Sequence, residues 1–176
     1  MIQERLKELR AQMQERGIDI YIVPTSDFHQ SEYVGEYFKA RKYMTGFTGS
    51  AGTAVITKEE AGLWTDGRYF IQAEKQLEGS TVKLFKMGEE GVPKVEEYVK
   101  DHLTEGSCIG FDGRVMDAKS GEKYAKMAEE KKAALYVKED LVGNIWKDRP
   151  QLPANKVWIL EDAYAGRSMA DKIADV

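Results

Sequence analysis

The stretch ARKYMTGFTGSAGTAVITKEEAGLWTDGRYF, residues 40–70, carries the strongest structural signals in the sequence. Its β-branched run Thr53–Thr57 and its second apolar run Ala61–Thr65 are joined by a short polar turn, which predicts a β-hairpin. Asp66 follows the hairpin as a plausible N-cap for a helix that starts at Gly67. Three glycines precede the hairpin and give a crowded loop its backbone freedom: Gly46, Gly49 and Gly52.

Outside this stretch, helical and strand patterns alternate along the chain. The expected helices are residues 2–13, 67–77, 93–103, 117–132 and 140–147, and the further strands are 18–23, 81–86, 108–111 and 134–137. Alternation with short connections is typical of α/β proteins, and the hairpin adds antiparallel neighbours. The sequence therefore predicts a three-layer α/β sandwich, with a mixed sheet of about six strands and helices on both faces.

Four sequence words resemble one known family. They are PTSDFHQSEY (Pro24–Tyr33), TGFTGSAGT (Thr45–Thr53), LWTDGRYFIQA (Leu63–Ala73) and LVGNIWKDRP (Leu141–Pro150). In this order they are similar to the amino-terminal domain of aminopeptidase P, the Xaa-Pro aminopeptidases of the creatinase and prolidase group. The first and last words resemble the larger, three-domain form of that enzyme.

A change of pattern near residue 150 indicates a domain boundary. Two prolines in a short polar stretch are typical of a linker, which we expect at residues 150–156. A further strand at Val157–Leu160 and a helix within residues 167–176 then indicate the start of a second, truncated α/β domain at 157–176. Residues 1–149 would form the first domain, and the resemblance also implies a second α/β domain followed by a catalytic one.

Composition narrows the class of protein. The formal net charge is −4 with both signs interspersed, which argues against nucleic acid as a main partner. No apolar run approaches the roughly 20 residues of a membrane span, and the charged start MIQERLKELR lacks the apolar core of a signal peptide. The single cysteine, Cys108, falls in an expected buried strand and favours a core role in a reducing compartment. We therefore expect a cytoplasmic protein.

The histidines do not predict a metal site. His29 lies in a loop and could share a face with Glu32 if a helix formed there, although a structural or interface role is favoured. His102 is expected at the exposed carboxyl end of a helix, where positive charge is favourable. The resemblance implies two divalent metal ions, of manganese type, in the catalytic domain that this sequence does not include. None of the family's metal ligands has a counterpart here.

Nucleophile and phosphate motifs are also unconvincing. The segment Thr48–Gly52 contains a serine between glycines, but it precedes a strand, whereas a nucleophile elbow follows a strand and opens a helix. The same order argues against a phosphate-binding loop. The turn Asp66–Arg68 has the right position at a helix start, yet it is too short and too acidic for a nucleotide.

Arg68 is the candidate site residue. A guanidinium at a helix start can donate outward to a carboxylate or carbonyl, or it can form an ion pair with Asp66 or a nearby glutamate. Composition alone favours the ion pair. The resemblance shifts this balance, because the arginine of the family's TDGRYF word is implicated in binding the peptide substrate, and Arg68 matches it.

Aromatic residues surround this position. Trp64, Tyr69 and Phe70 are expected to belong mainly to the core. A second group before the glycines suits either an interface or a small cluster beneath a long loop: Tyr33, Tyr37, Phe38, Tyr43 and Phe47.

The resemblance implies a non-catalytic domain of a metallo-aminopeptidase that releases the first residue of peptides with proline second. Such a domain would shape substrate access and support a homodimer, with Arg68 helping to bind the peptide. Because the sequence lacks a metal-ligand cluster, this chain alone is expected to be inactive. Two alternatives stay open: a stand-alone binding module of the same fold, and the amino-terminal domain of a prolidase or creatinase relative.

Overall fold

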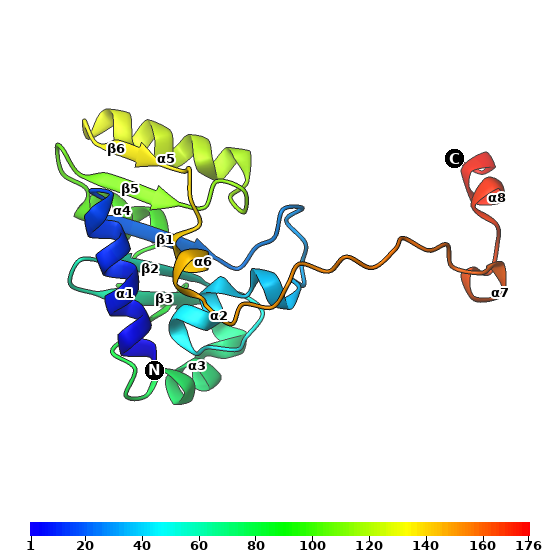
Figure 1. The fold of residues 1–176 in the computed structure, drawn as a ribbon, viewed down its shortest axis with the longest axis horizontal. Helices are drawn as coiled ribbons and strands as arrows, with labels where there is room; N and C mark the ends of the chain where they lie inside the picture. The colour runs from blue at the N-terminus through cyan, green and yellow to red at the C-terminus, as the bar shows by residue number, and fades with distance from the viewer.

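A computed structural model describes all residues, 1–176, and contains one sheet with helices on both faces (Figure 1). The strands are β1 (Ile20–Pro24), β2 (Thr53–Thr57), β3 (Ala61–Thr65), β4 (Lys83–Lys86), β5 (Cys108–Phe111) and β6 (Ala134–Tyr136). The α-helices are α1 (Ile2–Glu15), α2 (Ala40–Thr45), α3 (Phe70–Leu77), α4 (Val95–His102), α5 (Ala118–Glu130), α6 (Leu141–Ile145), α7 (Asp162–Ala165) and α8 (Met169–Ala174). Two short 3₁₀ helices are η1 (Glu36–Phe38) and η2 (Gly67–Tyr69).

The sheet has six strands in the order β4-β3-β2-β1-β5-β6. Strand β2 pairs antiparallel with both β1 and β3, whereas β1, β5 and β6 pair parallel, as do β3 and β4. The sheet is therefore mixed, and all strands except β2 run in the same direction. The predicted six-strand α/β fold and the predicted hairpin are both confirmed.

Alternation along the strands divides the core between the two faces of the sheet. On one face, Tyr21 and Val23 of β1 pack with side chains of α1, α2, α3 and α6. On the other face, Ile20 and Ile22 pack with side chains of α4 and α5. Successive residues of one strand thus enter different clusters, which produces the three predicted layers.

The carboxyl-terminal residues differ from the sequence expectation. The strand predicted at Val157–Leu160 is not formed, because this exposed segment has no neighbouring strand with which to pair. Residues 150–161 instead extend away from the sheet and end in α7 and α8 (Figure 1). The predicted helix within residues 167–176 is present as α8, and α7 was not predicted.

The buried phenol of Tyr124 predicts a loss of stability at high pH. Burial raises the pKa of Tyr124 well above its ordinary value of 10.0, so above that pH the unfolded chain releases this proton before the folded one. The contribution of this phenol to the free energy of unfolding is fully present below pH 10. Above pH 10 it falls by up to about 1.4 kcal/mol per pH unit. Unfolding followed against pH should show a shallower alkaline loss for Tyr124→Phe. The exposed Tyr164→Phe should retain the full slope.

Candidate functional site

The parallel strands place one set of loops at a single edge of the sheet. Strands β1, β3 and β5 all end at this edge, because they run in the same direction. A cleft of about 520 Å³ opens there and is bordered by Ser26 after β1, Asp66 after β3, and Val115 and Asp117 after β5. This edge carries Arg68, so the cleft and the predicted site residue lie on the same side of the molecule.

Arg68 forms the ion pair with Asp66 that its position in the turn suggested. Its Nε and Nη2 atoms donate to the two carboxylate oxygens of Asp66 at 2.8 and 2.9 Å. The Asp66 carboxylate also accepts from the backbone N–H of Arg68 at 3.1 Å, which confirms the predicted N-cap. These hydrogen bonds lower the pKa of Asp66 and raise that of Arg68.

The pairing leaves Arg68 available to a further ligand. Its side chain is 70% exposed, and its Nη1 group has no hydrogen-bond partner in the chain. A guanidinium has five N–H donors, and the bidentate pair with Asp66 occupies only those on one side. Asp66 therefore fixes the orientation of Arg68 while the remaining donors stay exposed to solvent.

Hydroxyl and aromatic groups surround Arg68. The guanidinium carbon lies 5.3 Å from the ring centre of Tyr69, whose hydroxyl is 2.7 Å from that of Ser50. Tyr33, which is 74% exposed, lies near enough to contribute to the raised pKa of Arg68, after the larger effects of Asp66 and Tyr69. The patch formed by Tyr33, Ser50, Arg68 and Tyr69 can donate several hydrogen bonds to carbonyl or carboxylate oxygens.

Some of the aromatic residues near the site are buried in the core, whereas others are partly buried or exposed. Trp64 is fully buried, whereas Tyr69 and Phe70 are only partly buried, so the core assignment holds fully for Trp64 alone. In the second group, Phe47 is buried and Tyr43 stacks on Trp146 with ring centres 4.6 Å apart. Only Tyr33 of this group is strongly exposed.

Arg41 holds the glycine-rich loop in place, a role that was not predicted from the sequence. Its guanidinium donates to Thr25 Oγ1 at 3.0 Å, to the Phe47 carbonyl at 2.5 Å and to the Gly49 carbonyl. The residue is only 3% exposed and has no carboxylate partner. Burial lowers its pKa to about 10, so the guanidinium remains charged at neutral pH.

A second Asp-Gly-Arg turn follows β5 and repeats the geometry of the first. Arg114 donates through Nε and Nη2 to the two carboxylate oxygens of Asp112, at 3.0 and 2.9 Å. The Asp112 carboxylate also accepts from the backbone N–H of Arg114 at 3.0 Å. This turn was not predicted from the sequence, although the repeated word DGR at residues 66–68 and 112–114 could have identified it.

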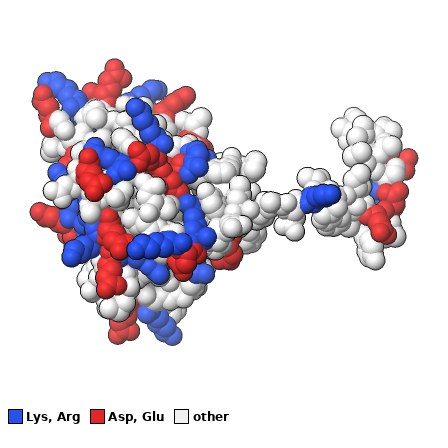
Figure 2. All heavy atoms as spheres, viewed as in Figure 1, with Lys and Arg blue, Asp and Glu red and all other residues white.

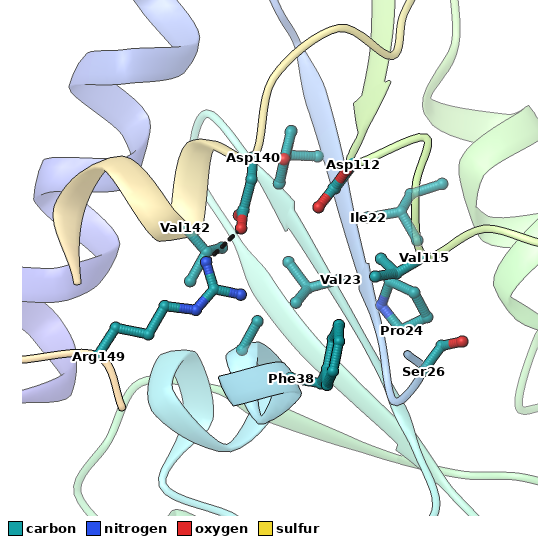
Figure 3. Close-up of a pocket in the computed structure, with 12 residues that line it drawn as sticks. Ile22, Val23, Pro24, Ser26, Phe38, Asp112, Val115, Asp140, Val142 and Arg149 are labelled. Carbon is teal, nitrogen blue, oxygen red and sulfur yellow. Dashed lines mark hydrogen bonds and ion pairs between the residues drawn. The ribbon is translucent and has the colours of Figure 1, made fainter. Parts of the chain in front are cut away.

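The second turn belongs to a chain of alternating charges. Arg114 Nη2 lies 3.6 Å from Asp140. The Asp140 carboxylate in turn accepts from Arg149 Nη1 at 2.5 Å (Figure 3). Arg149 Nε also donates to the Tyr37 carbonyl at 2.8 Å. The cavity beside Asp140 and Arg149 is only about 20 Å³, which leaves room for about one water molecule and excludes a peptide. This cluster ties the end of the domain to the sheet.

Neither histidine belongs to a group of potential metal ligands. His29 is exposed in a loop that forms no helix, so His29 and Glu32 do not share a helical face. His102 is exposed in the last turn of α4, as predicted, with its ring stacked on Tyr98 at 3.9 Å between ring centres. No group of three or more His, Cys, Asp or Glu side chains is arranged to hold a metal ion. The chain's own residues do not fit a dinuclear metal site.

Acidic and basic side chains are mixed over the visible face of the domain (Figure 2). No helix combines the length and the apolar character required to cross a bilayer. Cys108 is buried, and burial raises the pKa of its thiol, which makes it a weak nucleophile.

Comparison with known proteins identifies the family. The sequence model of the Creatinase/Prolidase N-terminal domain matches residues 5–139. The chain belongs to this family. It is 43% identical to Aminopeptidase P2 of Arabidopsis thaliana and 46% identical to a probable Xaa-Pro aminopeptidase P of Pyrenophora teres f. teres, in each case over 98% of this chain. It covers 25% and 26% of those two relatives, so this creatinase/prolidase N-terminal domain spans about a quarter of their length.

A solved structure resembles the chain over almost its whole length. The X-prolyl aminopeptidase of Caenorhabditis elegans, described as a cytosolic enzyme with a di-nuclear active site, superposes with a TM-score of 0.87 at 33% identity. The match covers 99% of this chain and 30% of that one. These similarities confirm the resemblance to Xaa-Pro aminopeptidases that the four sequence words indicated.

Proposed function

We propose that the chain is the non-catalytic amino-terminal domain of a metal-dependent Xaa-Pro aminopeptidase, and that Arg68 binds the peptide substrate. The geometry of Arg68 supports this role. Asp66 orients its guanidinium, the side chain is exposed, and some of its N–H donors have no partner. An oriented guanidinium of this kind can hold a peptide carbonyl or carboxylate while another domain performs the reaction.

The rest of the enzyme supplies the chemistry in this proposal. Two divalent metal ions, of manganese type, would be held by a catalytic domain outside this chain, because no suitable ligand cluster is present here. The domain would restrict substrate access, support a homodimer and act in the cytoplasm. The similarity to a cytosolic X-prolyl aminopeptidase with a di-nuclear site supports the metal and the compartment. The purified 176-residue chain supplied with Mn²⁺ should not cleave an Xaa-Pro peptide.

We also propose the domain division 1–149, linker 150–156, and start of a second α/β domain at 157–176. This division is supported by a run of three exposed apolar residues, Val157, Trp158 and Ile159, of which even the least exposed, Trp158, is 72% exposed. Exposure of such an apolar run to water is unfavourable in free energy, which suits a segment that packs within another domain. A stand-alone binding module is the alternative, and immunoblotting would distinguish them: a natural product near 19.9 kDa would favour the module.

Substitution of Arg68 tests the substrate-binding role. In the full-length enzyme, Arg68→Met should lower kcat/KM for an Xaa-Pro peptide by about tenfold, mainly through KM, because a binding contact is lost. Arg114→Met is the matched control, since it removes an arginine of the same local geometry from the turn after β5. A full-length Arg68→Met enzyme with unchanged kcat/KM would show that Arg68 serves only its ion pair with Asp66.

A further inference from the structure

A cavity of about 180 Å³ lies between the glycine-rich loop and the segment that leads into α2. We call it the basic cavity. The residues of its wall that matter here are Tyr33, Lys39, Arg41, Lys42, Thr48 and Ser50. Its lining includes three cationic side chains and no carboxylate. It shares Tyr33 and Ser50 with the patch around Arg68, so the two features are continuous.

The positive charge of the basic cavity is incompletely neutralised. Arg41 is buried, and its hydrogen bonds go only to a hydroxyl and two carbonyl oxygens. Lys39 is paired with Glu36, which lies outside the lining. Lys42 forms no ion pair, although its charge and that of Lys39 both lower the pKa of Glu36. Three cations therefore face a single nearby carboxylate.

Neutral donors complete the cavity. The Thr48 hydroxyl accepts from Gln72 Nε2 and Gln76 Nε2 at 2.9 Å and donates to Gln76 Oε1 at 3.3 Å. The Ser50 hydroxyl is paired with that of Tyr69 at 2.7 Å. The hydroxyl pair uses one of its two protons internally, so the other can be donated to an oxygen atom of an anion. A buried guanidinium is screened less by water than a surface lysine, so its attraction for an anion is stronger.

We propose that the basic cavity binds a carboxylate group of a peptide. The choice of a peptide rests on the proposed function. The volume is below the roughly 300 Å³ at which pockets for larger ligands begin, so it suits one terminal or side-chain group and not a whole peptide. A peptide whose backbone contacts Arg68 could place its carboxylate here, because Ser50 and Tyr69 connect the two features. The cavity would then select peptides by their charge.

Binding by the 176-residue chain itself tests this proposal. Backbone amide signals of Thr48–Ser50 should shift when Ala-Pro-Ala is added at constant ionic strength, and the C-terminal amide of the same peptide should bind about two- to fivefold more weakly. Ala-Pro-Glu amide identifies the source of the carboxylate. If it binds as well as Ala-Pro-Ala, then an acidic side chain also fits; if it binds like the plain amide, then the cavity takes the carboxyl terminus. Equal binding of all three peptides would overturn the proposal.

A pair of variants locates the effect. Lys42→Met should weaken binding of Ala-Pro-Ala by about two- to fivefold and reduce the difference between acid and amide, while Arg41 and Lys39 maintain part of it. Lys75→Met, at an exposed position of α3 outside the cavity, should leave both unchanged. An acid–amide difference of unchanged size in Lys42→Met would refute the cavity while leaving the role of Arg68 intact. Conversely, normal kcat/KM of full-length Arg68→Met would refute that role without altering this binding result.

Discussion

Replacing Trp64 with alanine is expected to lower the free energy of unfolding by about 3–5 kcal/mol, the range for large aromatic truncations in a packed core. Trp64 is fully buried in β3. Its ring stacks on Phe85 with ring centres 3.9 Å apart and meets Tyr98 edge-on at 4.9 Å. Its indole N–H donates to the Pro93 carbonyl at 2.8 Å. The substitution therefore removes apolar contact area, leaves a cavity and strands a carbonyl group.

Denaturant unfolding monitored by far-ultraviolet circular dichroism measures this loss. Trp158→Ala is the matched control, because that tryptophan is 72% exposed in the segment beyond the sheet and its truncation should change stability little. Equal stability of the two variants would show that the Trp64–Phe85–Tyr98 cluster contributes little. It would also mean that the other buried side chains of this cluster, Phe111 and Tyr124 among them, hold the sheet face covered by α4 and α5.

The fold was largely predictable because its signals are local. Each strand carries its own apolar run, and the hairpin Thr53–Thr65 follows from two such runs joined by a polar turn. The strand order was not predictable, since β1 lies between β2 and β5, and the pairing of Ile20 with Ile109 joins residues far apart in the sequence. A β-strand also needs a second strand with which to form hydrogen bonds. The apolar run Val157–Leu160 has no such partner in this chain, and its prediction as a strand was therefore wrong.

For the candidate site, too, only contacts between residues close together in the sequence could be predicted. The ion pair of Arg68 with Asp66 joins residues two positions apart, so local reasoning could anticipate it. The role of Arg41 was not predicted. Its acceptors are backbone carbonyls and a threonine 16 residues away, and these contacts cannot be read from the sequence. A charged residue also predicts exposure by default. The basic cavity depends on that buried arginine and became visible only in three dimensions.

Each of the three glycines before the hairpin is required for an identifiable structural reason. Gly46 ends α2 in a left-handed conformation, and Gly52 has a φ of +154°. Gly49 has no positive φ, but a Cβ there would lie 2.2 Å from the ring of Phe47. The backbone freedom predicted for this loop is thus needed at two positions, and at the third the requirement is space.

Gly52→Ala should destabilise the fold by about 2–4 kcal/mol, since backbone strain costs about 1–3 kcal/mol and overpacking a similar amount. A Cβ at this position would lie 2.8 Å from the backbone carbonyl oxygen of Trp64, which cannot rotate away as a side chain could. The loop would have to move. Because the Gly52 carbonyl accepts from Thr25, and Thr25 accepts from Arg41, that movement would reach the basic cavity.

Denaturant unfolding of Gly52→Ala beside Gly35→Ala separates this effect from a general response to glycine replacement. Gly35 has a negative φ and no atom within 4 Å of an added Cβ, so its substitution should be neutral or slightly stabilising. If Gly52→Ala is as stable as Gly35→Ala, then the loop tolerates displacement at its junction with β2. The position of Ser50 and Tyr69 beside Arg68 would then depend on the hydrogen bonds of Arg41, and not on the backbone of Gly52.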